Sequence, residues 1–340
     1  MSSLREVCGS VLSHIPGVGS DSNLEEKKIL CVGLACLDII QVVKEFPEED
    51  SDTRCISMRW QRGGNASNNC TVLSQLGVPC EFFGTLSKQQ HLDFMMNDFK
   101  AHNINIDNCV YYDNCDTPIS VVISSLTTGS RTIIHSNKNL PELTLEDFKK
   151  LDLSQYGWIH FEGRNVEEVT PMIEWVEMWN ESHSSEQDRG YGLGHKPLPV
   201  SLEIEKPRAA AQDLIPMADV LFVSKDFAEF RGCTTMSETL RNLALDTKHN
   251  ATIISAWGER GAMARAHDGT FVQSPAFPPN KVVDTLGAGD TFCATTLYGL
   301  SRGFSLQDCI FLGCQVAGAK VGIDGFVGLN KIYSRLKVTS

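Results

Sequence analysis

The segment 282–292 carries the strongest chemical signal in the sequence. It reads Val-Val-Asp-Thr-Leu-Gly-Ala-Gly-Asp-Thr-Phe, an apolar run that passes through a Gly-Ala-Gly turn into a predicted helix. Glycines let backbone N–H groups approach a ligand closely, and a helix N-terminus adds about half a positive charge. Gly287, Ala288 and Gly289 are therefore predicted to form an anion hole that holds phosphate oxygens.

Asp290 stands at the mouth of this predicted anion hole. As a helix N-cap, its carboxylate would stabilise the helix by about 1 kcal/mol. As a general base, it would take the proton from an alcohol that attacks a phosphorus atom held in the hole. The motif alone leaves both interpretations open.

Three further polar residues are candidate ligands for a sugar. In the string 62–68, Arg-Gly-Gly-Asn-Ala-Ser-Asn, glycines again precede a predicted helix, and Asn65 and Asn68 share a face of its first turn. Amides suit sugar hydroxyls, whereas capping is the structural alternative and is more credible for Asn65. Asp38 interrupts the apolar run 34–40, where an unpaired carboxylate is costly. It needs a partner, either two vicinal hydroxyls or a structural Lys or Arg.

The elements that must position these residues alternate along the chain. Apolar strands are predicted at 29–34, 158–161, 200–203, 220–223 and 251–256, and helices at 65–76, 88–102, 165–180, 208–214, 225–230, 290–300 and 306–321. This alternation predicts right-handed βαβ units and a mostly parallel sheet. Four segments do not fit that rhythm and are predicted to form a small, separate antiparallel sheet: 39–43, 55–60, 118–125 and 131–136. The expected architecture is one large α/β domain with a β-lid.

Composition restricts the partners and the compartment. The 340 residues include 30 Lys and Arg against 42 Asp and Glu, and the net charge of −12 disfavours nucleic acid and anionic membranes as partners. No apolar run approaches the roughly 20 residues of a membrane helix. The 12 cysteines form no Cys-x-x-Cys pair, and residues 1–23 lack a secretory signal. We expect a reduced, cytoplasmic protein with a flexible N-terminal extension at 1–23.

Motifs typical of other enzyme classes are absent or lack the structural context that they require. Walker A is absent, and the nine histidines show no metal-ligand spacing, so His160 is expected to be a polar residue at a strand edge. The string at 299–303 satisfies G-x-S-x-G, but it ends a helical pattern instead of following a strand. A hydrolase is therefore disfavoured.

The Gly-Gly-Asn string and the Asp-Thr-x-Gly-Ala-Gly-Asp string together resemble the ribokinase-like (phosphofructokinase B type) sugar kinases. The resemblance covers about 24–328 and continues through 158–165, 203–208, 222–226 and 313–318. It implies a ribokinase-like αβα sandwich at 24–330, with a lid formed by about 39–62 and 109–136 and a C-terminal tail at 331–340. The intervening strings are similar to those of enzymes that use ATP to phosphorylate D-fructose at its 1-hydroxyl.

The resemblance also implies a role for individual residues. Asp290 is similar to the catalytic base, and Gly287, Ala288 and Gly289 to the anion hole. The implied sugar ligands are Asp38, Gly64, Asn65 and Asn68, with Asp290. The implied nucleotide ligands, besides the anion hole, are Arg131, the loop Gly258, Glu259, Arg260 and Gly261, and the adenine-pocket residues Cys314, Ala317 and Gly318.

The resemblance implies ATP and sugar as partners, Mg²⁺ arriving with ATP, and a potassium ion near Asp284. It also implies a homodimer joined through the lids, which an exposed face carrying Ile39, Val42 and Val43 would favour. Many relatives carry Asn-x-x-Glu where this chain has Ser224-Lys225-Asp226-Phe227, so the metal-organising role is unassigned. A kinase for another sugar or a nucleoside, and a non-catalytic binding protein of this fold, remain alternatives.

Overall fold

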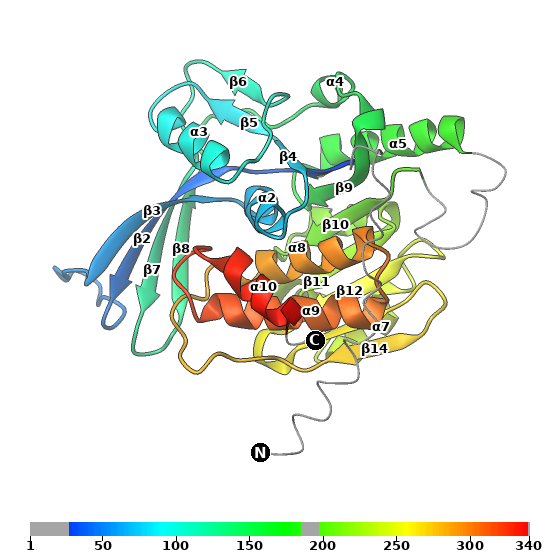
Figure 1. Cartoon of the computed structure of the whole chain (residues 1–340). Coiled ribbons are helices and arrows are strands. Elements are labelled where there is room, and N and C mark those ends of the chain that lie inside the picture. Colours follow the sequence, from blue (N-terminus) through cyan, green and yellow to red (C-terminus); the bar gives the residue numbers. More distant parts are fainter. Residues whose placement is uncertain (1–26, 185–196, 339–340) are drawn as a thin grey trace.

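The computed structural model describes residues 27–184 and 197–338. The extension expected at 1–23 lies outside the described residues. The predicted fold class is confirmed, since helices cover both faces of a mostly parallel sheet and a second, smaller sheet projects from it (Figure 1).

The central sheet has eight strands. Their spatial order is β14 (Phe271–Ser274), β13 (Ala262–Arg265), β12 (Thr252–Ala256), β11 (Val220–Ser224), β10 (Val200–Ile204), β9 (Tyr156–Glu162), β1 (Lys28–Val32) and β4 (Cys80–Phe83). The six strands from β12 to β4 pair in parallel, and β13 and β14 add an antiparallel edge. The carboxyl ends of the parallel strands therefore meet at one edge of the sheet.

Side-chain alternation along the strands divides the core into two layers. On β1, Ile29 and Cys31 face one layer, and Leu30 and Val32 face the other. The helices of the first layer are α2 (Asn65–Gln75), α3 (Leu92–Ala101), α8 (Ala288–Ser301), α9 (Leu306–Val321) and α10 (Leu329–Val338). The second layer contains α4 (Leu145–Phe148), η2 (Leu153–Gln155), α5 (Val166–His183), the 3-10 helix η5 (Ala209–Met217), α6 (Lys225–Phe230) and α7 (Met236–Leu243).

Some predicted boundaries are corrected. The helix expected at 88–102 begins at Leu92, and the segment 208–214 forms the 3-10 helix η5. Strands β13 and β14 and helix α7 were not predicted. The expected tail at 331–340 forms most of α10, where the Tyr333 hydroxyl donates to the Tyr298 hydroxyl at 2.8 Å.

The smaller sheet is the predicted lid. Its order is β3 (Ser57–Gly63), β2 (Cys36–Val43), β7 (Ile119–Ser125) and β8 (Arg131–Ser136), and it extends from the core at the left of Figure 1. The expectation of an antiparallel sheet is wrong for the central pair, because β2 and β7 run in parallel. Strands β5 (Thr85–Ser87) and β6 (Val110–Tyr112) form a separate short pair, so the second lid segment, expected from residue 109, starts at β7 instead.

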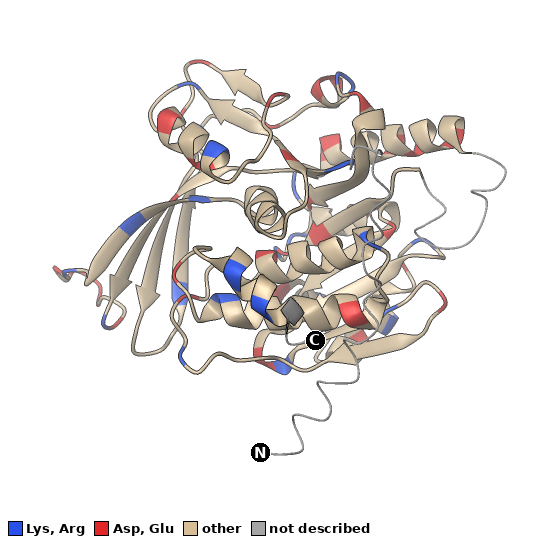
Figure 2. Cartoon of the chain, in the orientation of Figure 1, with Lys and Arg blue, Asp and Glu red and all other residues tan. Residues whose placement is uncertain are grey.

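Acidic and basic residues are interspersed along the chain (Figure 2). Among the described residues, none of the helices has both the length and the apolar character that crossing a bilayer requires.

Candidate active site

A cavity of about 460 Å³ lies where the parallel strands end. Leu34 follows β1, Glu162 ends β9, Glu205 follows β10, and Ala256 ends β12, and all four line the cavity. Ligands of open α/β sheets bind outside the carboxyl ends of the strands, so this is where a substrate is expected. The first turns of α2 and α8 and the inner face of the lid complete the walls.

The N-terminus of α8 opens onto this cavity. Gly287 has a φ of 77°, and a Cβ there would lie 2.5 Å from the ring of Phe326, so only glycine fits. A Cβ on Gly289 would meet nothing within 4 Å, and Ala288 lies between the two glycines. The turn therefore leaves open space beside backbone N–H groups at the positive end of the helix, as an anion hole requires.

Asp290 does not act as the N-cap of α8. The cap residue is Gly287, and no side chain accepts a capping hydrogen bond. Instead, the Nδ2 of Asn68 donates to Oδ2 of Asp290 at 2.7 Å. Burial raises the pKa of the Asp290 carboxyl well above its usual value, the nearby Glu203 and Glu205 raise it further, and the Asn68 hydrogen bond lowers it.

Steric crowding explains why two glycines, Gly63 and Gly64, precede α2. A Cβ on Gly63 would lie 2.1 Å from Oδ2 of Asp38, and a Cβ on Gly64, with φ 96°, would lie 2.1 Å from the carbonyl of Leu34. These glycines let the lid strand β3 pass close to the core beside Asp38. Gly64 is also the cap of α2, so the capping alternative for Asn65 is wrong.

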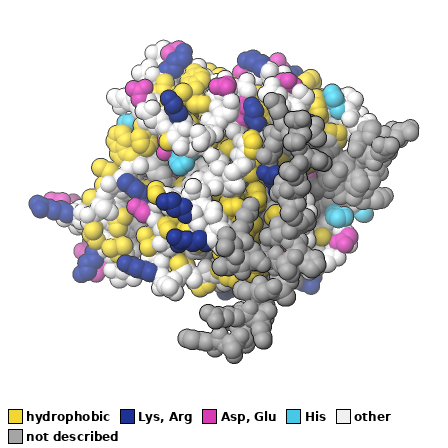
Figure 3. All heavy atoms as spheres, viewed as in Figure 1, with side chains coloured by type: hydrophobic (Ala, Val, Ile, Leu, Met, Phe, Trp, Pro, Cys, Tyr) yellow, Lys and Arg dark blue, Asp and Glu magenta, His cyan; other side chains and the backbone are white. Residues whose placement is uncertain are grey.

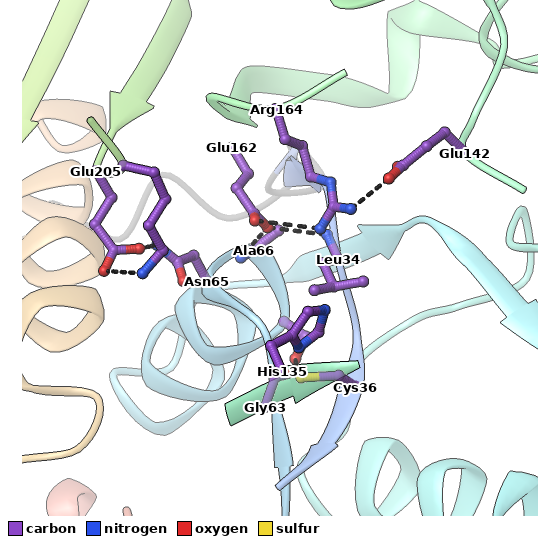
Figure 4. A network of polar contacts seen from close by, with 12 residues as sticks. Leu34, Cys36, Gly63, Asn65, Ala66, His135, Glu142, Glu162, Arg164 and Glu205 are labelled. Atoms are coloured by element: carbon purple, nitrogen blue, oxygen red, sulfur yellow. Dashed lines mark hydrogen bonds and ion pairs between the residues drawn. The ribbon is translucent and has the colours of Figure 1, made fainter. Parts of the chain in front are cut away.

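Asn65 and Asn68 of α2 both line the cavity. The Nδ2 of Asn65 donates to Glu205 at 2.8 Å and to Glu203 at 3.1 Å (Figure 4). Asn68 lies one turn further along, and its buried Oδ1 accepts no hydrogen bond. A buried acceptor without a donor is costly, so a ligand hydroxyl would fit there.

Asp38 reaches the same cavity from β2 and is 5% exposed. The Cys36 thiol lies 3.4 Å from its Oδ1, and burial raises the pKa of the Asp38 carboxyl. In the described part of the chain, no Lys or Arg forms an ion pair with it; Arg59 acts only at longer range. The alternative of a structural Lys or Arg pair is therefore wrong for this carboxylate among the described residues.

Three glutamates of the cavity were missed as site residues. Glu162 accepts from the backbone N–H of Leu34 at 2.9 Å, and Arg164 lies 3.6 Å from its other oxygen (Figure 4). Burial, Glu205 and Glu162 raise the pKa of Glu203 to about 8. The sequence could have indicated them, because these acidic residues lie at or just after the carboxyl ends of two predicted parallel strands. Such ends meet at one edge of the sheet, where ligands bind.

Basic side chains line the same cavity as the carboxylates. Arg131 comes from β8 of the lid, and its Nη1 donates to the Thr285 hydroxyl at 3.2 Å, two residues before Gly287. Lys206 and Arg208, which follow β10, also line the cavity. This arrangement places positive charge beside the anion hole, where a polyphosphate would need it.

Other predicted nucleotide ligands lie outside this cavity. The loop Gly258, Glu259, Arg260 and Gly261 contains the 3-10 helix η6 (Gly258–Arg260), and the Arg260 guanidinium lies over the Trp257 ring, 5.8 Å from its centre. Cys314, Ala317 and Gly318 lie on α9, and a Cβ on Gly318 would lie 2.0 Å from the carbonyl of Phe277. Their nucleotide role remains a prediction.

The donor set around Asp284 does not fit the expected potassium ion. Oδ2 of Asp284 accepts from Arg59 at 2.9 Å, from the buried Lys320 at 3.1 Å and from the Gly325 N–H at 3.0 Å. Its Oδ1 accepts from the Leu286 N–H, and Lys320 Nζ also donates to its backbone carbonyl at 2.9 Å. Protein cations satisfy this carboxylate, so we assign no metal to it.

Comparison with known proteins defines the class. Residues 26–326 match the model of the pfkB family carbohydrate kinases, and the chain belongs to that family. It is a carbohydrate kinase, an enzyme that transfers the terminal phosphoryl group of ATP to a sugar hydroxyl.

Individual relatives narrow the comparison. The chain is 47% identical to Ketohexokinase of Mus musculus over 310 residues. This alignment covers 90% of this chain and 100% of the relative. It is 24% identical to the Nucleoside kinase of Methanocaldococcus jannaschii, covering 88% and 92%. Among solved structures, a putative ribokinase from Agrobacterium tumefaciens shares the fold at a TM-score of 0.76 and 18% identity, covering 92% and 98%.

Proposed function

We propose that this protein transfers the terminal phosphoryl group of ATP to the 1-hydroxyl of D-fructose, giving fructose 1-phosphate and ADP. The identity of the sugar rests on the 47% identity to a full-length ketohexokinase. The observation that carries the chemistry is the position of Asp290. Its carboxylate lines one cavity together with Gly287 and Gly289 of the proposed anion hole and with the proposed sugar ligands Asp38, Asn65 and Asn68.

In this mechanism, the sugar binds against Asp38 and the two asparagines, with the accepting hydroxyl toward Asp290. Asp290 takes the hydroxyl proton as the oxygen bonds to the terminal phosphorus, and the bond from phosphorus to the leaving ADP oxygen breaks. The N–H groups at Gly287–Gly289 and the Arg131 guanidinium stabilise the charge on the transferred group. Mg²⁺ enters as part of the MgATP substrate, and it prefers the oxygen ligands that the cavity carboxylates offer.

The test is an ADP-release assay on the purified protein with D-fructose, D-ribose and adenosine. We expect the highest kcat/KM with fructose, and NMR of the product should show the phosphate on carbon 1. A preference for ribose or adenosine would support the alternative of a kinase for another sugar or a nucleoside, to which a nucleoside kinase is also similar. No turnover with any of them would favour a non-catalytic binder.

Asp38→Ala tests the sugar side of the cavity. Loss of a hydrogen bond to a charged group costs about 1.5–3 kcal/mol, so we expect the KM for fructose to rise about 10- to 100-fold. The KM for ATP should change little, because Asp38 lies on the lid away from the anion hole. Asp113→Ala, at an exposed aspartate that pairs with Lys88, is the matched control. An equal rise in both KM values would contradict the assignment.

We also propose that the enzyme is a homodimer joined through its lids. Ile39 pairs with Trp60 on one side and Val121 on the other, and Val121 pairs with Ile134, so the four form one row across the outer face. Trp60 and Ile134 are 44% and 60% exposed, and hydrophobic side chains reach the surface of the lid in Figure 3. The expected set is corrected: alternation turns Val42 to the opposite face, and Val43 is buried.

Ile134→Glu should therefore convert the dimer to a monomer, because it places a charge on the most exposed member of this apolar row. Sedimentation velocity measures the change. Leu245→Glu, at a residue that is 84% exposed and remote from the lid, should remain dimeric. A monomeric native protein at micromolar concentration would rule out the lid dimer.

We further propose a cytoplasmic location. Ten of the eleven cysteines in the described part of the chain are buried, where they act as small core residues that a reducing compartment keeps as thiols.

A further inference from the structure

Three metal-binding side chains meet at the floor of the substrate cavity. His160 is on β9, Glu203 on the adjacent β10, and Cys293 one turn after Asp290 on α8. One ligand atom from each lies within 4.8 Å of the other two. His160 is fully buried, and therefore does not lie at the exposed strand edge expected from the sequence.

The histidine ring is held in a fixed orientation. The Nε1 of Trp158 donates to the Ser201 hydroxyl at 2.8 Å, and this hydroxyl also lies 2.8 Å from Nδ1 of His160. The ring therefore directs Nε2 at Glu203 and Cys293. Metal-binding histidines are usually oriented in this way by a hydrogen bond at the other ring nitrogen.

The spacing is close to that of a tetrahedral cation site, and of the two contacts of His160 only the one with the thiol is also within hydrogen-bond distance. Nε2 of His160 lies 3.7 Å from Oε2 of Glu203 and 3.8 Å from Sγ of Cys293. An N–O contact of 3.7 Å is too long for a hydrogen bond. Tetrahedral Zn²⁺ with ordinary bond lengths would separate the same atoms by about 3.4 Å and 3.6 Å. A shift of a few tenths of an ångström would close the site.

We propose that His160, Glu203 and Cys293 form an inhibitory site for a soft divalent cation of the Zn²⁺ class. Thiolate and imidazole ligands select Zn²⁺ over Mg²⁺, which requires oxygen ligands, so the Mg²⁺ that accompanies ATP does not compete. Binding forms a metal–sulfur bond and releases the proton of the Cys293 thiol to solvent. The cavity supplies the entry path, because both Glu203 and Cys293 line it.

Occupation of the site would interfere with the reaction in two ways. Glu203 accepts from Asn65 through Oε1 at 3.1 Å and from Asn69 through Oε2 at 3.4 Å. A metal on Oε2 would compete with Asn69 and draw the carboxylate away from Asn65. The cation would also place positive charge one helical turn from Asp290, where it makes the carboxylate a weaker base. Occupation of the site would therefore weaken sugar binding and slow proton transfer to Asp290.

The first test measures binding without turnover. The native protein, Cys293→Ser and Cys309→Ser are each titrated with Co²⁺, whose visible spectrum reports tetrahedral thiolate coordination, and then with Zn²⁺ to displace it. Cys309 is the matched control, a buried cysteine on α9 that does not line the cavity. We expect the native protein and Cys309→Ser to show the Co²⁺–thiolate bands, and Cys293→Ser to bind at least about 10- to 100-fold more weakly.

The second test measures inhibition of ADP release by Zn²⁺ at saturating MgATP. The native enzyme and Cys309→Ser should be inhibited over the range in which the site fills, and Cys293→Ser only at 10-fold higher Zn²⁺ or more. Identical binding by all three proteins, or binding without inhibition, would overturn the proposal. If Cys293→Ser does not fold, Glu203→Gln, which keeps the side-chain shape, must lose the cobalt spectrum in its place. The binding readout requires no substrate, so its failure is distinct from a failure of the proposed sugar specificity.

Discussion

Asp290→Asn is expected to fold, to bind nucleotide, and to lose about 10²- to 10⁴-fold in kcat, which corresponds to about 3–5 kcal/mol of barrier. The asparagine keeps the shape and the contact with Asn68 but cannot take a proton. Stability should be unchanged or higher, because the variant removes a carboxylate whose burial raises its pKa. Steady-state kinetics and thermal unfolding measure the two effects.

Asp308→Asn is the matched control for this variant. Asp290 and Asp308 occupy the same position in their helices, three residues after the cap residues Gly287 and Ser305. Asp308 lies outside the cavity, so its substitution should cost at most about 1 kcal/mol of stability through the helix dipole and leave kcat unchanged. A loss of less than tenfold in Asp290→Asn would show that its carboxylate is not the base.

The same carboxylate sets a direction for the pH dependence. A base must be deprotonated, and the raised pKa of Asp290 means that protonation begins at a higher pH than for an ordinary aspartate. We therefore expect kcat/KM to fall on the acid side through that raised pKa in the native enzyme. A rate profile from pH 5 to pH 9 measures it, and the acid limb should be absent from the residual activity of Asp290→Asn.

Lys320→Met is expected to destabilise the fold by about 3–5 kcal/mol, because it removes one partner of a buried ion pair. The Lys320 side chain is fully buried, and Nζ holds both the carbonyl and the carboxylate of Asp284. Without it, the carboxylate keeps Arg59 and the N–H of Gly325. Urea denaturation gives the change in the free energy of unfolding.

Two comparisons make this prediction specific. Lys138→Met breaks an exposed pair with Asp116, where Lys138 is 76% exposed, and should stay within about 0.5 kcal/mol of the native protein. Adding Asp284→Asn to Lys320→Met should recover part of the loss, because no buried carboxylate then lacks its ammonium partner, and Arg59 keeps its ion pair with Asp324. Equal stability of Lys320→Met and Lys138→Met would show that the buried pair contributes nothing to the fold.

The sequence predicted the parts of the site that local patterns specify. Gly287, Gly289 and Asp290 lie at the start of α8 as predicted, although a loop precedes them instead of the expected strand end. Asn65 and Asn68 lie one turn apart on α2 as their spacing requires. The strands of the parallel sheet were predicted for the same reason, because strands buried on both faces appear as continuous apolar runs.

What could not be predicted depends on long-range packing. Lys320 is 36 residues from Asp284, and no local pattern shows that its ammonium donates to that carboxylate. The sequence also gives no sign that His160, Glu203 and Cys293 lie close together, because 43 and 90 residues separate them. Their proximity depends on the strand order of the sheet and on the packing of α8 against it. The exposed face of the lid was assigned incorrectly at Val42, because residues three apart on a strand point to opposite faces, a local rule that the prediction did not apply.

The central claim is that Asp290 is the base between the sugar and the phosphate. A crystal structure with D-fructose and a non-hydrolysable ATP analogue tests it most directly. The account predicts the 1-hydroxyl within about 2.6–3.2 Å of the Asp290 carboxylate, with the terminal phosphate at the N–H groups of Gly287–Gly289. A sugar bound with no hydroxyl in reach of Asp290, or a phosphate held away from α8, would contradict it.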